Sequence, residues 1–424
     1  MTARPRLLVL AQSLPYPPHS GVANRTFNVL RQLRVEYDVD LVAFFRTNHQ
    51  PDNAAREAAW RSLRKVAASV AEPTPIPNEH SAVRKMWDHL RSLASGRAYT
   101  YYEYDSRAFA ERLQATLRAR RPDLVHLDSL DLHRWLPDLP HAPIACTHHN
   151  LESELLRRYA LGLTPALLRR YVLAQADRVE AVERELCPRL ALNVMVSAVD
   201  AEKLRVVAPG APTAIVPNGT DTDYFQPADA ASIPGRVVFV GPTYSHPNRD
   251  AVELLLHDIW PRVRAADRHA CLRLIGRNAA MDQARYAVEP GVRPLGHVPD
   301  IRPAVAEARC CVVPIRIGGG TRLKILDAWA MGKAVVSTSI GCEGLDAVDG
   351  ENILIRDAPD AFAGAVLDVL HDATLRARLE RNARRTALEI YSWIVVGRRI
   401  RAAYNQLLDR PVSLPAHRGG ALVA

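Results

Sequence analysis

The sequence predicts an α/β protein of two domains, each with a parallel sheet covered by helices. Short apolar runs, typical of buried strands, alternate with longer amphipathic stretches along most of the chain. This alternation runs to about residue 197 and restarts near residue 236, after a stretch (209–217) that contains Gly and Pro. A length of 424 residues also suits two domains of about 200 residues each.

In the first half, apolar runs give the strands and apolar positions three or four apart give the helices. The expected strands are 6–11, 38–45, 122–127, 143–147 and 191–197, and the expected helices are 24–34, 53–70, 81–95, 107–120 and 151–190. In the second half, the expected strands are 237–241, 271–276, 310–314, 334–338 and 352–355, and the expected helices are 250–265, 302–308, 321–331, 360–389 and 392–408. Strands separated by helices need parallel crossovers, so ligands are expected at the carboxyl ends of the strands.

Composition and charge narrow the classes of function. Lys and Arg total 55 against 46 Asp and Glu, which gives a net charge of +9. This balance suits a nucleic-acid binder, or an enzyme that handles anionic ligands or works beside an anionic membrane. Because the arginines are spread along the chain without an interleaved basic and aromatic patch, the sequence argues against nucleic acid as a partner.

The apolar runs are all short, and they indicate a protein of the cytoplasm. None approaches the ~20 residues of a membrane helix, and the first run is too short for a secretory signal. The six cysteines form no CxxC pair and lie mostly in apolar segments, which indicates reduced core thiols. We therefore expect a cytoplasmic location, with peripheral contact at the inner face of a membrane as an option.

The strongest local signal is a glycine-rich segment, 316–333, that follows an apolar run. Gly318, Gly319 and Gly320 let the backbone approach a ligand closely, and a helix is expected to begin just after them. Free N–H groups at a helix N-terminus form an anion site that suits phosphate. The nearby cations are Arg316, Arg322 and Lys324. The alternative is a tight turn without a ligand.

Asp327 is expected about two turns into that helix, on the face shared with Gly320 and Lys324. A carboxylate there could accept hydrogen bonds from ribose hydroxyl groups, as the acidic residue of a dinucleotide site does. The alternative is a Lys324–Asp327 ion pair on a solvated face.

Several segments together resemble glycosyltransferase family four. They are the PNGTDTDYF run from Pro217, the LDAWAMGKAVVST run with the following GCEGL and DGENILI, the VGPTYSHPN run from Val240, and Tyr391-Ser-Trp393. The resemblance covers residues 5–408 and is strongest over 215–357. It implies the GT-B fold, in which two Rossmann-like domains face each other across a cleft and a C-terminal helix crosses back to the first domain.

The sequence departs from the family pattern at two places. The first acid of the E-x7-E motif falls on Gly319, and the second acid is Asp327. The Arg and Lys that many relatives carry after the first strand of the second domain are also missing, near Pro242 and Pro247. We expect Arg316, Arg322 or Lys324 to supply the positive charge instead.

The resemblance also assigns roles to residues. Gly21, in a loop after the first strand, is expected to close over the diphosphate, with Arg25 approaching it, and Gly241 is expected to lie in the donor site. Backbone groups at His297 and Val298 are expected to hold the nucleobase. The alternative for the first loop is a Pro-rich turn before an ordinary helix that starts at Asn24.

His149 is the expected catalytic residue, in the His148-His149-Asn150 loop after a strand of the first domain. By resemblance, it would bond a hydroxyl group of the donor sugar. The alternative is a histidine pair before a helix that Asn150 caps. No third ligand is spaced to complete a metal site with the pair.

Residues 84–93 form a basic amphipathic stretch with a tryptophan. By resemblance, such helices of the first domain often touch a membrane, where lipid-linked acceptors reside. The alternative, which we favour at this stage, is a surface helix that packs Met86, Trp87 and Leu90 inward.

These observations predict a metal-independent, retaining glycosyltransferase without a cofactor that belongs to polysaccharide or glycoconjugate biosynthesis. Its partners would be a nucleotide-diphosphate sugar and a glycan, lipid-linked or small-molecule acceptor. The expected parts are an acceptor domain (1–208), a donor domain (209–390), a helix packing back (391–410) and a flexible tail (411–424). Two alternatives stay open: a non-catalytic relative, or another GT-B activity such as an epimerase or an inverting transferase with His149 or Asp128 as base.

Overall fold

The computed structural model describes residues 4–18, 20–79, 81–228, 232–277 and 280–409. The chain divides into two compact units, Met1–Val216 with Gly397–Ala424, and Pro217–Val396. The observed boundary between the units, after Val216, lies later in the chain than the boundary expected after residue 208. The expected flexible tail, 411–424, lies outside the described residues.

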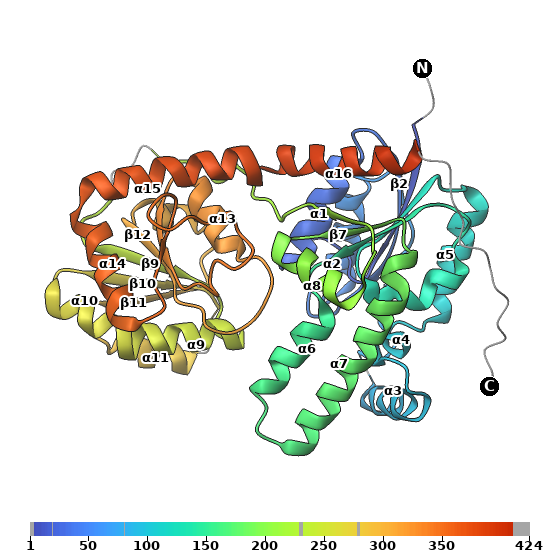
Figure 1. The fold of residues 1–424 in the computed structure, drawn as a ribbon, viewed down its shortest axis with the longest axis horizontal. Coiled ribbons are helices and arrows are strands. Elements are labelled where there is room, and N and C mark those ends of the chain that lie inside the picture. The colour runs from blue at the N-terminus through green and yellow to red at the C-terminus, as the bar shows by residue number, and fades with distance from the viewer. Residues whose placement is uncertain (1–3, 19, 80, 229–231, 278–279, 410–424) are drawn as a thin grey trace. The chain divides into compact units, whose positions relative to one another are not determined.

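The first unit contains a parallel sheet in the order β3-β2-β1-β5-β6-β7-β8, and β4 also pairs with β2 (Figure 1). Strand β1 (Arg6–Ala11) is apolar and buried after its first residue, as expected for a strand that helices cover on both faces. The other strands are β2 (Asp38–Phe45), β3 (Ser69–Val70), β4 (Thr74–Pro75), β5 (Leu124–Leu127), β6 (Ile144–His148), β7 (Leu192–Met195) and β8 (Thr213–Ile215). The chain order reverses between β1 and β5, which is where such sheets bind ligands.

Helices surround this sheet, and α6 and α7 extend from it as a long hairpin (Figure 1). They are α1 (Gly21–Leu33), α2 (Asn53–Leu63), α3 (Ala82–Ser95), α4 (Tyr99–Glu103), α5 (Arg107–Ala119), α6 (Glu152–Leu161), α7 (Ala166–Leu186) and α8 (Ala198–Val207), with the short 3₁₀ segments η1 (Leu130–Asp138) and η2 (Cys187–Arg189).

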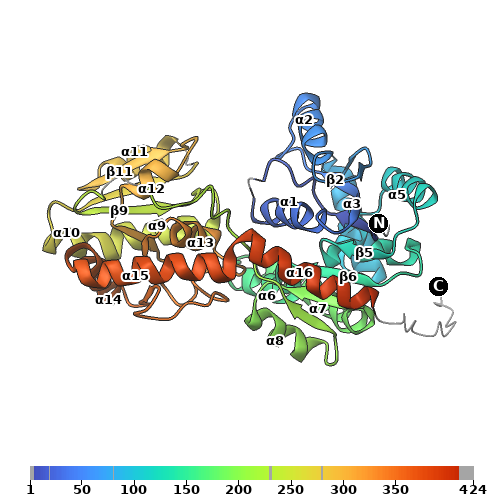
Figure 2. The same cartoon turned by 90° about the horizontal axis from the view of Figure 1, so that it is seen from above.

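The second unit repeats the architecture with a parallel sheet in the order β11-β10-β9-β12-β13-β14 (Figure 2). The reversal lies between β9 and β12. Its strands are β9 (Arg236–Val240), β10 (Cys271–Ile275), β11 (Val292–Gly296), β12 (Cys310–Val313), β13 (Ala334–Ser337) and β14 (Leu354–Ile355). Its helices are α9 (His246–Leu254), α10 (Trp260–Ala266), α11 (Ala280–Ala287), α12 (Arg302–Ala306), α13 (Leu323–Ala330), α14 (Pro359–His371) and α15 (Ala373–Thr386), with π-helical turns η3 (Leu255–Ile259) and η4 (Ala387–Tyr391). Helix α16 (Trp393–Leu408) begins in this unit, and its residues from Gly397 on belong to the first unit.

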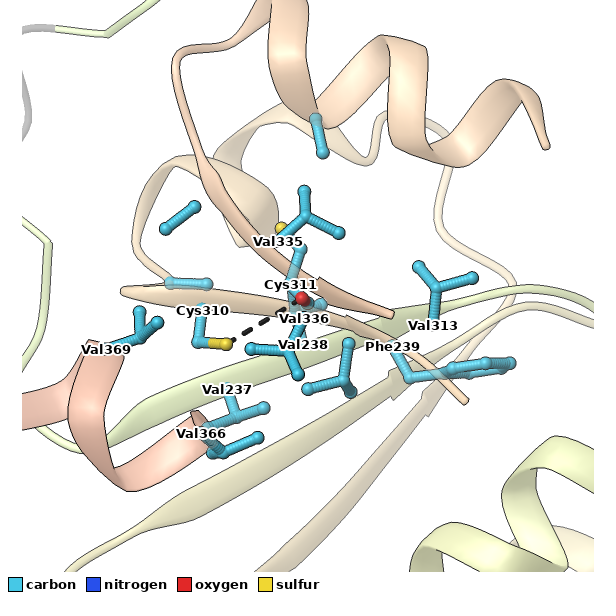
Figure 3. Close-up of a cluster of buried hydrophobic side chains, with 14 of the residues drawn as sticks. Val237, Val238, Phe239, Cys310, Cys311, Val313, Val335, Val336, Val366 and Val369 are labelled. Atoms are coloured by element: carbon cyan, nitrogen blue, oxygen red, sulfur yellow. Dashed lines mark hydrogen bonds between the residues drawn. The ribbon is translucent and has the colours of Figure 1, made fainter. Parts of the chain in front are cut away.

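The core of the second unit is formed mainly by β-branched side chains of its central strands (Figure 3). Val237 of β9, Cys310 of β12 and Val335 of β13 are fully buried, and Val366 and Val369 of α14 pack against the same cluster. All six cysteines of the chain are free, and five are buried. This rigid core fixes the strand ends from which the loops of interest start.

Three sequence expectations about helices are wrong. Helix α1 begins at Gly21 with Ser20 as its cap, and therefore Gly21 lies in a helix and not in a loop. Helix α13 begins at Leu323, two residues later than expected, because the chain from Gly318 to Arg322 is not helical. Met86, Trp87 and Leu90 of α3 point outward, with 65%, 57% and 49% of their surface exposed.

No helix among the described residues is long and apolar enough to span a membrane.

Candidate functional site

The glycine loop and Gly241 both follow strands at the reversal point of the second sheet. Gly241 directly follows β9, and the segment Gly318–Gly320 follows β12, the strand beside it. Gly318 and Gly320 have φ angles of +106° and +75°, which side chains rarely adopt. The backbone of this loop is therefore shaped by glycine at the place where an open α/β sheet binds ligands.

Lys324 lies at the same point. Its Nζ donates to Asn248 Oδ1 at 2.8 Å and stands 4.4 Å above the ring of Phe239. A Cβ on residue 241 would lie 2.7 Å from this Nζ, so glycine is needed there for the lysine to approach. Burial, with a smaller effect of Arg322, lowers the pKa of Lys324 to about 7.

The two arginines near the loop are turned to other partners. Arg316 forms a two-bond ion pair with Asp250 of α9, at 2.7 and 3.1 Å, and half of its side chain is exposed. Arg322 donates to the carbonyl oxygen of Gly319, so it folds back over the loop. Among the three cations that the sequence offered, Lys324 is the one beside Gly241 at the strand ends.

Asp327 contacts Thr220, and the alternative of a Lys324–Asp327 ion pair is ruled out, because Lys324 bonds Asn248. Thr220 Oγ1 donates to Asp327 Oδ1 at 2.8 Å. Burial raises the pKa of Asp327 to about 7, although the bond from Thr220 acts in the opposite direction. Close to neutral pH, this carboxyl group can thus be present in either protonation state.

The segment that holds Thr220 is the PNG run quoted above. A Cβ on Gly219 would lie 2.7 Å from the indole ring of Trp393, which explains glycine at that position. The amide of Thr220 also donates to the carbonyl of Tyr391 at 2.8 Å. The run therefore packs against the start of α16 and places Thr220 against α13.

The other site residues predicted for the second unit are Gly319, Thr321, His297 and Val298. Gly319 and Thr321 belong to the loop before α13, and therefore their amides precede the helix. His297 is exposed and Val298 half-buried, directly after edge strand β11, with β10 between that strand and β9. The structure thus gathers Gly241, the glycine loop and Lys324, and it leaves His297 two strands away.

In the first unit, the strand ends carry polar side chains. His149 follows β6 and Asp128 follows β5, and the distance from His149 Nε2 to Asp128 Oδ1 is 3.4 Å. Thr26 of α1 donates to the same oxygen at 2.7 Å. Burial favours a higher pKa for Asp128, but His149, His126 and Thr26 outweigh it, so the pKa lies below its usual value and the group is charged.

Arg25 is buried in the first unit, whereas we expected it to approach the donor diphosphate. It is 2% exposed, and its Nη2 donates to the carbonyl of Val216 at 2.8 Å. Burial lowers its pKa to about 10, while Asp128 acts in the opposite direction. Arg25 is therefore part of the interior of the first unit.

A small pocket that opens to solvent adjoins His149. Its lining includes Asp131, Thr147, Glu152 and Glu183. Burial raises the pKa of Glu183 to about 7 and also raises those of Asp131 and Glu152. Carboxyl groups that carry a proton can both donate and accept, which suits ligand hydroxyl groups.

Sequence reasoning missed several of these residues. Asn150 is not the helix cap, since Leu151 precedes α6 in that position. Asn248 lies in the VGPTYSHPN motif and Thr220 in the PNGTDTDYF motif, and these motifs were the sequence signal that could have identified both residues. Glu152 lies in the segment that begins with His148, which was its signal, whereas Asp131 and Glu183 had none, because they come from separate segments.

Among the described residues, no group of three or more His, Cys, Asp and Glu side chains is arranged to hold a metal ion.

Two family models match the chain. The model of Glycosyltransferase Family 4 matches residues 19–224, and the model of Glycosyl transferases group 1 matches residues 234–372. A search of curated proteins found no significant match.

Several solved structures share the fold across both units. Sucrose-phosphate synthase from Thermosynechococcus elongatus is 16% identical, with a TM-score of 0.68 and coverage of 95% of this chain and 99% of that one. Anabaena HepE in complex with UDP is 14% identical, with a TM-score of 0.64 and coverage of 95% and 100%. A variant of S. aureus TarM in complex with fondaparinux, α-GlcNAc-glycerol and UDP is 9% identical, with a TM-score of 0.64 and coverage of 96% and 100%.

Proposed function

The chain is a glycosyltransferase with the GT-B fold, and from this premise we propose that it transfers a sugar from a nucleoside-diphosphate sugar to a hydroxyl group of an acceptor. The observation that carries the proposal is the meeting of the glycine loop, Gly241 and Lys324 at the reversal point of the second sheet. A diphosphate needs N–H donors and a cation, and this place offers both. HepE structures with UDP and with UDP-glucose have the same fold, which supports such a donor.

In this proposal, Lys324 and the loop amides stabilise the negative charge that develops on the leaving diphosphate. Asp327 accepts a hydrogen bond from the ribose, and His297 and Val298 hold the base through their backbone. The protein supplies the positive charge itself, which supports transfer without a metal ion.

We assign the acceptor to the pocket beside His149 in the first unit. Burial raises the pKa values of its carboxyl groups and so favours their protonated form, which can both donate to and accept from the hydroxyl groups of a glycan. The bond from the sugar C1 to the diphosphate breaks, a bond from C1 to the acceptor oxygen forms, and the acceptor proton passes to the leaving phosphate.

The resemblance to family four supports retention at C1 and a role in cell-surface glycan synthesis, and the free cysteines support a cytoplasmic location.

The alternative is an inverting transfer, which the pair His149–Asp128 favours. A charged Asp128 that lies 3.4 Å from the ring could hold His149 as a general base for the acceptor hydroxyl. Proton NMR of the product distinguishes the two, because the anomeric coupling reports retention or inversion directly.

The proposal is tested by thermal melts with UDP, GDP, dTDP and ADP in EDTA, followed by turnover of the matching sugar nucleotide. At a hundredfold excess over Kd, a bound nucleotide adds about 2.7 kcal/mol of stability. Gly320→Asp places a negative charge in the loop and should abolish the shift. If no nucleoside diphosphate and no nucleotide sugar raises the melting temperature, the assignment of the donor site is wrong.

A further inference from the structure

The pocket beside His149 has an acidic lining. Three of its side chains are carboxyl groups: Asp131 of η1, Glu152 at the start of α6, and Glu183 of α7. Burial, followed in size by the charge of Asp131, raises the pKa of Glu152 to about 8. The carboxyl groups therefore share a region in which negative charge costs free energy, and a cation placed among them would offset that cost.

The lining offers little positive charge of its own. Among the described residues that line the pocket there is no lysine or arginine. Burial lowers the pKa values of His133 and His148 to about 4, so both rings are neutral at pH 7. The third histidine of the lining, His149, already lies 3.4 Å from the charged Asp128. A cationic partner for the carboxyl groups of the pocket therefore has to come from a ligand.

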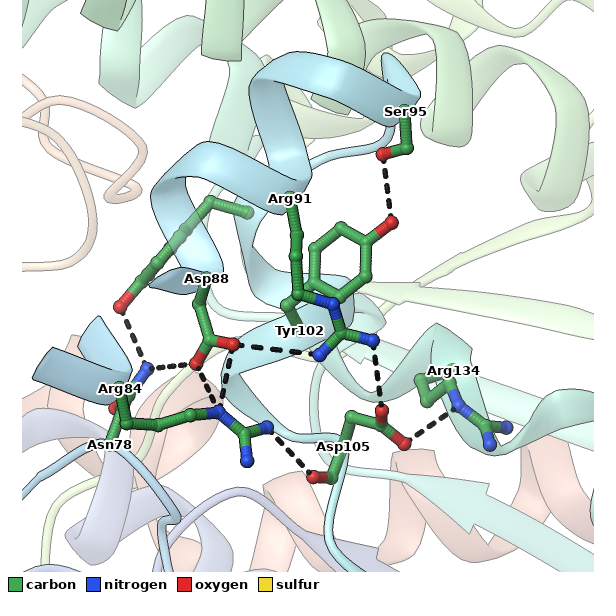
Figure 4. A network of polar contacts seen from close by, with 9 residues as sticks. Asn78, Arg84, Asp88, Arg91, Ser95, Tyr102, Asp105 and Arg134 are labelled. Atoms are coloured by element: carbon green, nitrogen blue, oxygen red, sulfur yellow. Dashed lines mark hydrogen bonds and ion pairs between the residues drawn. The ribbon is translucent and has the colours of Figure 1, made fainter. Parts of the chain in front are cut away.

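The arginines of neighbouring segments are paired with other carboxyl groups (Figure 4). Arg134 of η1 donates to Asp105 Oδ1 at 3.2 Å, and Arg91 of α3 lies 3.8 Å from the other oxygen atom of this carboxylate. Arg84 and Arg91 also pair with the buried Asp88, at 2.8 and 3.7 Å. These contacts fasten η1 to α3 and to the segment after α4. Since η1 and α4 both supply lining residues, the contacts hold one wall of the pocket in place.

Glu183 is bonded within the unit, which leaves Asp131 and Glu152 as the carboxyl groups for a ligand. Both oxygen atoms of Glu183 accept hydrogen bonds from Ser153, one from its amide at 3.1 Å and one from its hydroxyl group. Glu183 is buried and fixes the start of α6, whereas Asp131 and Glu152 are partly exposed. From outside the lining, the charge of Arg46 acts on the pKa of Asp131 against the effect of burial.

A buried hydroxyl group belongs to the same lining. Thr147 of β6 is 1% exposed, and its Oγ1 has no hydrogen-bond partner among the described residues. An unpaired buried hydroxyl group costs free energy, so its presence in a pocket indicates a ligand that bonds it. Its oxygen atom can accept a hydrogen bond as well as donate one.

The size of the pocket and the number of acceptors indicate which group binds there. The pocket has room for one group of about the size of a water molecule. An ammonium group has three N–H donors and no acceptor, which matches two carboxylates and one hydroxyl oxygen. A hydroxyl group of similar size donates once and carries no charge, so it leaves two ionised carboxylates without compensation.

We propose that the acceptor carries a primary amino group, as a sugar with a free amine does, and that its ammonium form binds to Asp131, Glu152 and Thr147 in this pocket. The hydroxyl group that receives the transferred sugar belongs to the same acceptor molecule and remains outside the pocket. The inference rests on the proposed function for the identity of this ligand as the acceptor.

The experiment compares sugars in which an amino group replaces a hydroxyl group of similar size. D-glucosamine and 6-amino-6-deoxy-D-glucose are each compared with D-glucose, and D-galactosamine is compared with D-galactose. Calorimetry on the full chain, with and without UDP, measures the affinities. At least one amino sugar should bind about tenfold or more tightly than its hydroxyl counterpart, because charge-assisted hydrogen bonds are the stronger ones. If no amino sugar binds more tightly, the inference is overturned.

Matched variants test the carboxyl group directly. Glu152→Gln and Glu154→Gln make the same change on α6, but Glu154 lies outside the lining and pairs with Arg158 at 3.0 Å. Only Glu152→Gln should lower the affinity for the amino sugar, by about tenfold, and it should leave the affinity for the hydroxyl counterpart within about twofold. Thr147→Val keeps the shape of the side chain and should weaken the amino sugar severalfold. Unchanged amino-sugar affinity in Glu152→Gln would contradict the inference.

Failure of this inference is distinguishable from failure of the proposed function. The melts with nucleoside diphosphates test the second unit, whereas the preference for an amine and its loss in Glu152→Gln test the first unit. If a nucleotide binds and no amino sugar is preferred, the inference fails and the proposed transfer stands. If an amino sugar is preferred and no nucleotide binds, the amine site stands and the donor site fails.

Discussion

The carboxyl ends of the two parallel sheets differ in what they present to a ligand. In the first unit, the loops after β5 and β6 present titratable side chains, among them Asp128, His149 and Glu152. In the second unit, the loops after β9 and β12 present glycine backbone, with Lys324 as the cation beside it. The same topology thus presents side chains at one sheet end and glycine backbone at the other, which is why we propose the acceptor hydroxyl for the first and the donor diphosphate for the second.

The largest expected effect tests the cation of the second unit. Lys324→Met keeps the length of the side chain and removes its charge. Since charge-assisted hydrogen bonds contribute about 1.5–3 kcal/mol, the affinity for the preferred nucleoside diphosphate should fall roughly 100-fold by calorimetry. Lys65→Met, at an exposed position of the first unit, is the matched control and should leave the affinity unchanged. An unchanged affinity in Lys324→Met would move the phosphate contact to Arg316 or Arg322.

The second prediction concerns Asp128 in the first unit, where side chains form the candidate site. Asp128→Asn removes the charge beside His149 but keeps the shape and the bond from Thr26. If His149 is the general base of the inverting alternative, kcat should fall about tenfold or more while the donor KM stays within about twofold, because Asp128 then positions the group that takes the acceptor proton. Asp138→Asn, which is partly exposed in the same unit, is the control. A rise in donor KM with constant kcat would contradict this role.

The contrast between the sheet ends also explains what the sequence could and could not predict. The glycine loop is a local signal, because Gly318 to Lys324 are neighbours in the chain. The contacts of Lys324 with Asn248 and Gly241 need the fold, and so does the ion pair that occupies Arg316. In the first unit, Thr26, Asp128 and His149 lie on three separate segments. Sequence reasoning therefore named His149 and Asp128 as separate candidates and did not pair them. The orientation of α3 was missed because Asn78, which donates to the buried Asp88, and Gln175, which donates to the buried Ser92, lie outside the helix.

The third prediction uses the titration of Lys324. Its pKa of about 7 means that the free protein loses this charge as the pH rises from 7 to 9. A bound diphosphate favours the protonated form, so affinity should fall with rising pH, by up to about tenfold per pH unit. Lys324→Arg should flatten this dependence because arginine stays charged. If the pH dependence of the affinity persists in this variant, the group that titrates is not Lys324.

The smallest expected effect concerns stability and the second acid of the motif. Burial raises the pKa of Asp327 in the folded protein to about 7, above its ordinary value near 4. The stability from its neutral form is therefore full below about pH 4 and is lost as the pH rises through 7. Asp327→Asn cannot ionise, and its Oδ1 can still accept from Thr220. Urea unfolding should therefore show the variant about 1–2 kcal/mol more stable at pH 8 and nearly equal to the wild type at pH 4. A variant that is less stable at both values would mean that the ionised carboxylate is stabilised in the fold. Asp327 would then resemble the charged Asp128 of the first unit, and the contrast between the two sheet ends would be weaker.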